Sequence, residues 1–352
     1  MNIDDVLKLK AFDLVGGTKN KIFLDKIKAL TLHHYQNCDE YKKIIKGLKI
    51  NLKSINKIED YPMIPTKVFK KFNLMSVSKN KIVKKLVSSG TSGKLSSIYL
   101  DQKNATNQTK VLKKIISTIL GESRLPMLII DQNPKLLDRS TFNARAAAIY
   151  GFSIFGKNHH FLLSEKGKID YEGINNFLKK FGSDKFFIFG FTSLIYENLI
   201  LNFKNRSVNS NLKNGILLHG GGWKKMEKIG VSNNEFKKKL FNKTRIKNVY
   251  NYYGLVEQTG SIFIDCKKCG NFITSSFSDV LIRNKKFELE KTGKKGLVQL
   301  ISLLPTSYPG HNILTEDIGE IVGQEMCDLK GKHFKLYGRA KEAEIRGCSD
   351  AR

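Results

Sequence analysis

The spacing of apolar residues is helical in the first part of the chain. In residues 1–80, apolar positions recur at steps of three and four, as in I-F-L-D-K-I-K-A-L-T-L-H-H-Y at 22–35. This period predicts amphipathic helices, and we expect them to wrap around the rest of the protein. Pro62 and Pro65 interrupt the helical pattern and lead into the next region.

Short apolar runs alternate with helical stretches in residues 81–260. Runs at 127–130, 186–189 and 216–218 each end in a polar or glycine-rich turn. The stretch 103–120 has helical spacing and is followed by Gly121. This alternation is typical of an α/β fold with a largely parallel sheet.

Strand-like segments dominate after residue 248. They lie at 261–265, 272–275, 280–283, 297–304 and 320–322. Their lengths and the turns between them favour an antiparallel, barrel-like region. Because the sequence has no internal repeat or long linker, we expect one compact body. Its expected regions are 1–80, an α/β core at 81–260 and a β-rich region at 261–352.

Length and cysteine content agree with a reduced, cytoplasmic protein. The chain has 352 residues, and 41% of them are hydrophobic, which suffices for a packed core. It has no apolar run of about 18 residues, and its start resembles neither a signal peptide nor a transit peptide. The number of cysteines is odd, at five, which favours free thiols over a disulfide framework.

The chain is strongly basic, with 61 Lys+Arg against 32 Asp+Glu and a formal net charge of +29. Such a charge attracts nucleic acids, so a nucleic-acid-binding protein is one alternative. However, the lysines are spread over nearly the whole length, without a recognition motif or interleaved aromatic residues. We therefore favour solvated lysine faces and an anionic substrate, with no nucleic acid as partner.

A loop at 87–95, V-S-S-G-T-S-G-K-L, gathers hydroxyls, glycines and a lysine. Its flanks, 85–87 and 97–100, predict the two strands of a hairpin-like element. Backbone N–H groups, hydroxyls and a cation suit phosphate, although the spacing excludes a P-loop. From this stretch alone, a solvated turn and a nucleotide site are both open. The candidate ligands are Ser88, Ser89, Gly90, Thr91, Ser92, Gly93 and Lys94.

Further glycine-rich or acidic clusters follow predicted strands, where α/β proteins place their sites. They are H-G-G-G-W at 219–223, Y-Y-G-L-V-E-Q-T-G at 252–260 and T-E-D-I-G-E at 315–320. The first resembles the oxyanion loop of lipases, but the chain has no G-x-S-x-G elbow. We therefore discount a serine hydrolase.

The order of these motifs resembles that of adenylate-forming enzymes. Within that superfamily, the chain is most similar to the LuxE-type acyl-protein synthetases, also called luciferin-component ligases, which are related to phenylacetate-CoA ligases. The likeness covers nearly the whole chain. It is carried by A-R-A-A-A-I-Y-G-F-S-I-F-G-K at 144–157, L-H-G-G-G-W-K-K at 218–225, Y-Y-G-L-V-E-Q-T-G-S-I at 252–262 and R-G-C-S-D at 346–350.

The resemblance implies ATP-dependent activation of a carboxylic acid to an acyl-adenylate, with Mg²⁺ as cofactor. The serine-rich loop would hold the β- and γ-phosphates, with Lys94 as a catalytic cation, and Glu257 would bind Mg²⁺ and assist catalysis. The implied nucleotide contacts are Gly220, Gly221 and Gly222 along adenine, Tyr253 stacking on it with Gly254 beside it, Asp317 on the ribose, and Arg339 on the ribose or α-phosphate.

The family's near-terminal cysteine matches Cys348. It would receive the acyl group as a thioester, and a mobile C-terminal arm would carry it to a partner such as an acyl reductase. The acid would be a fatty acid, in a tunnel that includes parts of 144–156 and 188–196. Two alternatives remain open. One is a coenzyme A ligase-like enzyme of surface-polysaccharide or lipid pathways, and the other is a scaffold protein that keeps the fold without the catalytic activity.

The chain departs from the wider superfamily in ending shortly after the Gly-Arg motif. Most members continue with a small mobile domain that carries a catalytic lysine, and we expect this domain to be absent or truncated. Which lysine replaces it, Lys94, Lys341 or another, is open.

A C-x₂-C pair at Cys266 and Cys269 has the spacing of a zinc half-site. Cys327 and His311 would complete the site only if the fold brings them close; otherwise the pair lies in a free-thiol turn. His159 and His160 are either packed core histidines or, for one of them, a border of the acyl pocket.

Overall fold

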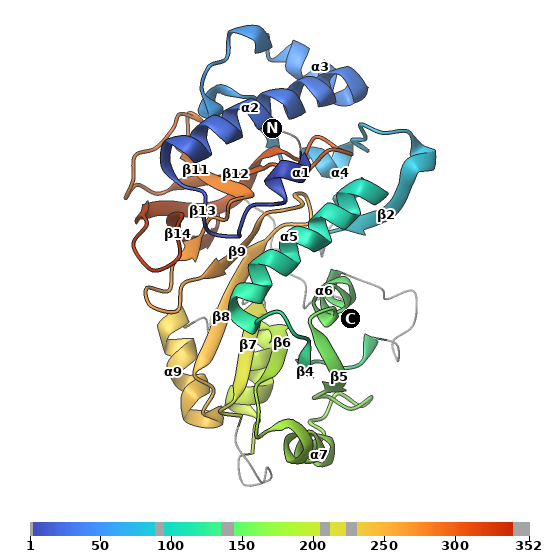
Figure 1. Ribbon diagram of the computed structural model, residues 1–352, viewed down its shortest axis with the longest axis vertical. Coiled ribbons are helices and arrows are strands. Elements are labelled where there is room, and N and C mark those ends of the chain that lie inside the picture. Colours follow the sequence, from blue (N-terminus) through green and yellow to red (C-terminus); the bar gives the residue numbers. More distant parts are fainter. Residues whose placement is uncertain (1–2, 89–94, 135–143, 205–211, 223–230, 341–352) are drawn as a thin grey trace.

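The computed structural model describes residues 3–88, 95–134, 144–204, 212–222 and 231–340 (Figure 1). Most of its strands form one twelve-stranded sheet, and the other two form a separate hairpin. The helices are α1 (Ile3–Val6), α2 (Gly16–Asn37), α3 (Asp39–Gly47), α4 (Val68–Lys71), α5 (Gln102–Leu120), α6 (Ala144–Ser153), α7 (Tyr171–Phe181), α8 (Thr192–Ile195) and α9 (Asn233–Thr244), with short turns η1 (Leu52–Ser54), η2 (Ile58–Asp60) and η3 (Lys79–Lys81) and a π-helix η6 (Tyr196–Leu201).

The order of strands in the large sheet is β11-β12-β13-β14-β10-β9-β8-β7-β6-β4-β5, and β1 pairs with β13 outside this path. The strands are β1 (Ile64–Pro65), β4 (Leu125–Ile130), β5 (Gly156–Phe161), β6 (Phe186–Phe191), β7 (Gly215–Gly220), β8 (Asn248–Gly254), β9 (Ile262–Asp265), β10 (Phe272–Ile273), β11 (Ser278–Arg283), β12 (Gly296–Ser302), β13 (Asn312–Gln324) and β14 (Lys332–Arg339).

The half of the sheet from β8 to β5 is parallel, as the alternating pattern predicts. Strands β4, β6 and β7 are largely buried, whereas the edge strand β5 exposes residues 157–159, and successive residues of each strand point to opposite sides. Met127 and Ile129 belong to a buried cluster that also contains residues of α5 and α6, whereas Leu128 and Ile130 belong to a second cluster with residues of α7, η6 and α9. The parallel half is therefore a three-layer α/β arrangement, with the carboxyl ends of its strands at one edge.

The C-terminal strands are antiparallel, also as predicted. They extend the parallel sheet through the β8–β9 pair, and in the described residues the strand order does not close into a barrel. The twist of the sheet brings α3, β3 and β11–β14 around a third cluster of buried apolar residues. The division at residues 80 and 260 remains a prediction.

The N-terminal helices lie over the antiparallel half (Figure 1). Buried Lys19 on α2 donates to the carbonyl oxygens of Ser275 and Ser278, at 2.8 and 3.0 Å. On the same helix, His34 Nε2 lies 3.1 Å from the carbonyl oxygen of Pro305. These contacts hold α2 against the antiparallel half of the sheet, near both ends of the helix.

The predicted hairpin and the helix after it are confirmed. Strand β2 (Ile82–Val87) pairs antiparallel with β3 (Ser97–Asp101), with Val87 opposite Ser97. Helix α5 ends at Leu120 and is capped by Gly121. The φ of Gly121 is 84°, a conformation that glycine adopts at little cost in free energy. None of the described helices combines the length and apolar character needed for a membrane span.

Candidate functional site

Three residues predicted to contact the nucleotide lie together where β8, β13 and β14 meet. The Tyr253 hydroxyl donates to Asp317 Oδ2 at 2.6 Å. Arg339 Nε lies 3.5 Å from Asp317 Oδ1, and Asp317 and Arg339 are direct cross-strand partners. Antiparallel pairing of β13 with β14 therefore unites two motifs that are 22 residues apart in sequence.

Burial controls the protonation of this group. It raises the pKa of Asp317, while the Tyr253 hydrogen bond and the Arg339 charge oppose the rise. Burial, and then the Asp317 charge, raises the pKa of Tyr253 well above its usual value, so Tyr253 stays a hydrogen-bond donor at neutral pH. The result is a carboxylate with a donor on one oxygen and a guanidinium near the other. Such a carboxylate suits the hydroxyls of a ribose.

Glu316 is a member of this group that the sequence motif did not single out as a contact. Arg339 Nη2 lies 2.9 Å from Glu316 Oε2, and Lys67 Nζ lies 2.8 Å from Glu316 Oε1. The backbone N–H of Ala340 also donates to the Glu316 carbonyl, at 2.9 Å. Glu316 thus fixes the end of β14 and the position of Arg339. Its position directly before Asp317 was the only signal.

The predicted adenine segment lies at the end of β7, beside β8. Gly220 is opposite Tyr252, and a Cβ at Gly220 would lie 2.4 Å from Cε1 of that ring. Gly221 has φ +77°, and both Gly221 and Gly222 are exposed. The ring that contacts Gly220 is therefore Tyr252, while Tyr253 points to the other face of the sheet, toward Asp317. The adenine contact of Tyr253 remains a prediction.

Glu257 lies in the turn between β8 and β9 and is buried, with 1% exposure. The turn is held on several sides by hydrogen bonds. Gly260 N donates to Gln108 Oε1 at 2.6 Å, and Thr259 N donates to the Tyr308 hydroxyl at 2.8 Å. Helix α5 therefore helps to position the Glu257 turn through Gln108. The helical pattern around Gln108 showed no sign of this role.

Ser88 closes the base of the serine-rich loop. Its N–H donates to the Ser96 carbonyl at 2.9 Å, and its hydroxyl oxygen accepts from Ser96 N at 3.0 Å. The rest of the predicted phosphate loop, from Ser89 to Lys94, lies outside the described residues, as do Lys341 and Cys348.

The two segments predicted to line the acyl tunnel do pack together. The Phe152 ring on α6 lies 4.6 Å from the ring of Phe189 on β6 and 4.9 Å from that of Tyr252. Arg145 Nε donates to buried Asp131 at 2.6 Å, which ties α6 to the end of β4. An apolar cluster thus lies next to the glycine turn. Neither Arg145 nor Asp131 was singled out from the sequence.

Of the residues considered as zinc ligands, the three cysteines lie close together and the histidine lies elsewhere. The Sγ atoms of Cys266, Cys269 and Cys327 lie within 4.8 Å of one another. The condition that the fold bring the partners close is met by Cys327 but not by His311, which stacks on His34 at 4.9 Å and has its Nε2 2.9 Å from Thr31 Oγ1. Burial lowers the pKa of His311 to about 3, so it is a neutral core histidine.

His159 and His160 lie on β5, away from the nucleotide motifs in sequence. His159 is exposed, with Nε2 3.1 Å from the Ser153 carbonyl oxygen. His160 stacks on Phe177 of α7 at 5.9 Å, on the face of the sheet opposite α6. His160 is therefore a packed histidine.

Three comparisons bear on this site. The family model for the LuxE acyl-protein synthetases matches residues 1–352. The long-chain-fatty-acid–luciferin-component ligase of Vibrio harveyi is 24% identical over 341 residues, covering 92% of this chain and 85% of that protein. The protein of the same name from Photorhabdus luminescens is 34% identical over 92 residues, covering 26% of this chain and 75% of that protein.

Among solved structures, the fold is similar to that of 2-hydroxyisobutyryl-CoA ligase in complex with 2-HIB-AMP and CoA. The TM-score is 0.73 at 9% identity, with 94% of this chain and 72% of that chain covered. This likeness confirms the expected fold. Together with the match over the whole chain, it leads to one conclusion: the protein belongs to the LuxE acyl-protein synthetase family and is an acid–thiol ligase.

Proposed function

We propose that this ligase activates a fatty acid with ATP to an acyl-adenylate, and that the acyl group then passes to Cys348 as a thioester. The observation that carries the first step is the Tyr253–Asp317–Arg339 group, whose tyrosine lies on β8, the strand that pairs with β7 up to its glycine turn. It offers a ribose acceptor and a cation next to exposed backbone. The names of the Vibrio and Photorhabdus relatives support a long-chain fatty acid as the substrate.

In the first step, a carboxylate oxygen of the acid attacks the α-phosphorus of ATP and the bond to the β-phosphate bridging oxygen breaks, which releases pyrophosphate. Asp317 would orient the ribose, and Arg339 would offset negative charge near the α-phosphate. The carboxylate of Glu257 fits the preference of Mg²⁺ for hard oxygen ligands, and Mg²⁺ would supply charge neutralisation at the phosphates. The serine-rich loop and Lys94 would hold the leaving pyrophosphate.

In the second step, the Cys348 thiolate attacks the acyl carbonyl and the bond to AMP breaks. The thioester keeps the acyl group activated and leaves it on a residue close to the end of the chain. A protein partner, such as an acyl reductase, would then take it. This second step rests on the match of R-G-C-S-D to the family motif.

Acid-dependent ATP–pyrophosphate exchange tests the first step. Purified full-length protein is incubated with ATP, Mg²⁺, labelled pyrophosphate and saturated acids of increasing chain length. We expect exchange that requires both the acid and Mg²⁺ and that is highest for long chains, because the Phe152–Phe189 cluster is apolar. If no acid supports exchange, the adenylation proposal is wrong. If only short or aromatic acids do, the fatty-acid assignment is wrong.

A further inference from the structure

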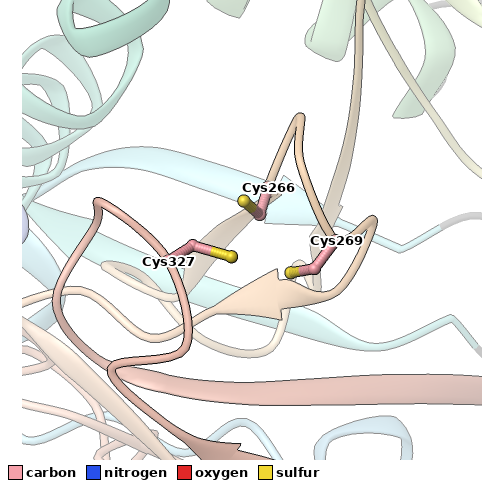
Figure 2. Close-up of side chains that lie close together, drawn as sticks. All are labelled: Cys266, Cys269 and Cys327. Carbon is pink, nitrogen blue, oxygen red and sulfur yellow. The ribbon is translucent and has the colours of Figure 1, made fainter.

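A cluster of sulfur atoms lies away from the nucleotide motifs, where two hairpins of the antiparallel half meet. Cys266 and Cys269 lie in the turn between β9 and β10, and Cys327 lies in the loop between β13 and β14. Strand pairing of β10 with β14 sets the two loops side by side. Figure 2 shows the three side chains with their sulfur atoms gathered in the space between the loops.

The spacing of these sulfur atoms fits one metal ion. In a tetrahedral zinc site with Zn–S bonds of about 2.3 Å, neighbouring sulfur atoms lie about 3.8 Å apart. The three Sγ atoms are all within 4.8 Å of one another, so a small movement of the loops would bring them into that geometry. Cys266 is buried, Cys327 is half-buried and Cys269 is exposed, which leaves an entry path for the ion.

His333 is a candidate for the fourth ligand. His333 is the second residue of β14, is paired with Ile273 of β10 and is fully buried. Its Nδ1 atom lies 3.5 Å from Cys269 Sγ. Neighbouring sulfur and nitrogen ligands of a tetrahedral zinc ion are about 3.6 Å apart. The ring therefore has the separation from Cys269 that coordination of one ion requires. It is not within 4.8 Å of all three sulfur atoms, so the loops carrying Cys266 and Cys327 would have to move toward it.

We propose that Cys266, Cys269, Cys327 and His333 bind a structural zinc ion. Three thiolates and one imidazole are a closed zinc ligand set, and soft sulfur ligands disfavour Mg²⁺ and Ca²⁺. Binding releases the protons of three thiols, and the resulting site carries one negative charge. Lys267 and Lys268, between the first two cysteines, offset that charge.

The ion would join two loops that otherwise depend on weak contacts. In addition to strand pairing, Lys268 Nζ and Asp328 are 2.8 Å apart, but both side chains are exposed. Exposed pairs of this kind contribute little to stability. Because β14 continues from His333 to Arg339, zinc would fix the start of the strand whose end carries the nucleotide-site arginine. Its role is structural, so it does not depend on the proposed function.

Metal content of the full-length protein tests the site directly. Protein purified under reducing conditions in the presence of zinc is passed over a desalting column and analysed by inductively coupled plasma mass spectrometry. We expect one zinc per chain in the wild type and in Cys38→Ser, since Cys38 belongs to a different cluster. We expect zinc to be lost in Cys269→Ser and Cys327→Ser, whose thiols are not fully buried.

Cobalt substitution tests the ligands without relying on variants that fold poorly. Wild-type protein titrated with Co²⁺ should show thiolate-to-cobalt charge-transfer bands and tetrahedral ligand-field bands that saturate at one equivalent. His333→Gln should shift the ligand-field bands and weaken binding, while His159→Gln should change neither. Unchanged bands in His333→Gln would remove His333 from the site.

Two results would overturn the whole proposal. One is wild-type protein that stays free of zinc and shows no charge-transfer bands with Co²⁺. The other is a combination of two findings. The intact mass, measured without reductant, shows a disulfide between two of the three cysteines, and the reduced protein does not bind zinc.

Discussion

The Tyr253 hydroxyl donates a 2.6 Å hydrogen bond to Asp317 Oδ2, across 64 residues of sequence. This contact joins the tyrosine-glycine motif at the end of β8 to the acidic motif of β13. It leaves Asp317 Oδ1 facing Arg339, at 3.5 Å. The relationship explains how two separate motifs form one group, which is the proposed nucleotide site.

The first prediction separates the roles of these two residues. Asp317→Ala should raise the KM for ATP in pyrophosphate exchange by about 10- to 100-fold, because hydrogen bonds to a charged group contribute about 1.5–3 kcal/mol. Tyr253→Phe keeps the ring and removes only the orienting hydroxyl, so a rise of a few-fold is expected. Glu122→Gln, an exposed carboxylate on the loop after α5, is the control. Equal effects of Asp317→Ala and Glu122→Gln would refute the ribose role.

The second prediction concerns the two cations on Glu316. Arg339→Gln should raise the KM for ATP, because Arg339 adjoins both Glu316 and Asp317. Lys67→Gln should change it by less than about twofold, since the Lys67 side chain pairs with Glu316 rather than with Asp317 among the described residues, and it is 57% exposed. Steady-state kinetics of both variants give the comparison. A larger effect from Lys67 than from Arg339 would contradict the assignment.

The third prediction uses a matched pair of glycines. A Cβ at Gly220 would lie 2.4 Å from the Tyr252 ring, which is itself packed against Phe152, so Gly220→Ala should destabilise the protein by about 1–3 kcal/mol. Apart from its chain neighbours, no atom of the described residues lies within 4 Å of a Cβ at Gly222, so Gly222→Ala should leave stability unchanged. Urea unfolding measures both.

If the Gly222 backbone lies against adenine, Gly222→Ala should nevertheless raise the KM for ATP. Wild-type kinetics in Gly222→Ala would argue against the adenine position, whatever the stability of Gly220→Ala.

The fourth prediction concerns the buried lysine that anchors α2. Burial lowers the pKa of Lys19 from 10.5 to about 8, Asp279 opposes the shift and Lys332 adds to it. Between pH 8 and 10.5 the unfolded chain keeps a proton that the folded protein has lost. The free energy of unfolding should therefore rise with pH in this window, by at most about 3 kcal/mol. Below pH 8 both states are protonated, and this contribution to the pH dependence vanishes.

Lys19→Met removes the titrating group and leaves Asp279 paired with Lys332, at 2.8 Å. Urea unfolding of both proteins at pH 7.5 and pH 10 isolates the effect, because other titrating groups cancel in the difference. The wild type should gain stability relative to Lys19→Met as pH rises. Parallel pH dependences would mean that the Lys19 pKa is not lowered.

Local patterns in the sequence were sufficient for the hairpin, for α5 and for the buried parallel strands. Periodicity and the glycine at 121 are properties of neighbouring residues, so they can be read without the fold. The contacts of Tyr253 with Asp317 and of Cys269 with His333 could not be predicted in this way. Each contact joins residues 64 positions apart in sequence. Tyr253 and Asp317 lie on β8 and β13, which are not paired with each other, and Cys269 meets His333 because β10 pairs with β14, so both contacts depend on how the whole sheet is arranged.

The Cys266–Cys269 pair also shows that sequence spacing cannot identify partners that are distant in the sequence. The C-x₂-C spacing predicted half of a zinc site and named Cys327 and His311 as possible partners. The fold confirms the proximity of Cys327, whereas His311 lies against α2, just before β13. The histidine next to Cys269 is His333, which lies on β14 beside β10 and is the fourth ligand in our proposal. Sequence spacing pointed to thiol ligands, whereas the neighbouring histidine could be named only from the strand order.

Covalent labelling of wild type and Cys348→Ser tests the central claim most directly. Each protein is incubated with ATP, Mg²⁺ and a radiolabelled long-chain fatty acid, then denatured, separated by electrophoresis and treated with hydroxylamine; Cys38→Ser is the control. We predict acid-dependent pyrophosphate exchange in all three proteins, and hydroxylamine-sensitive label on wild type and Cys38→Ser only. Label that persists on Cys348→Ser would contradict acyl transfer to Cys348.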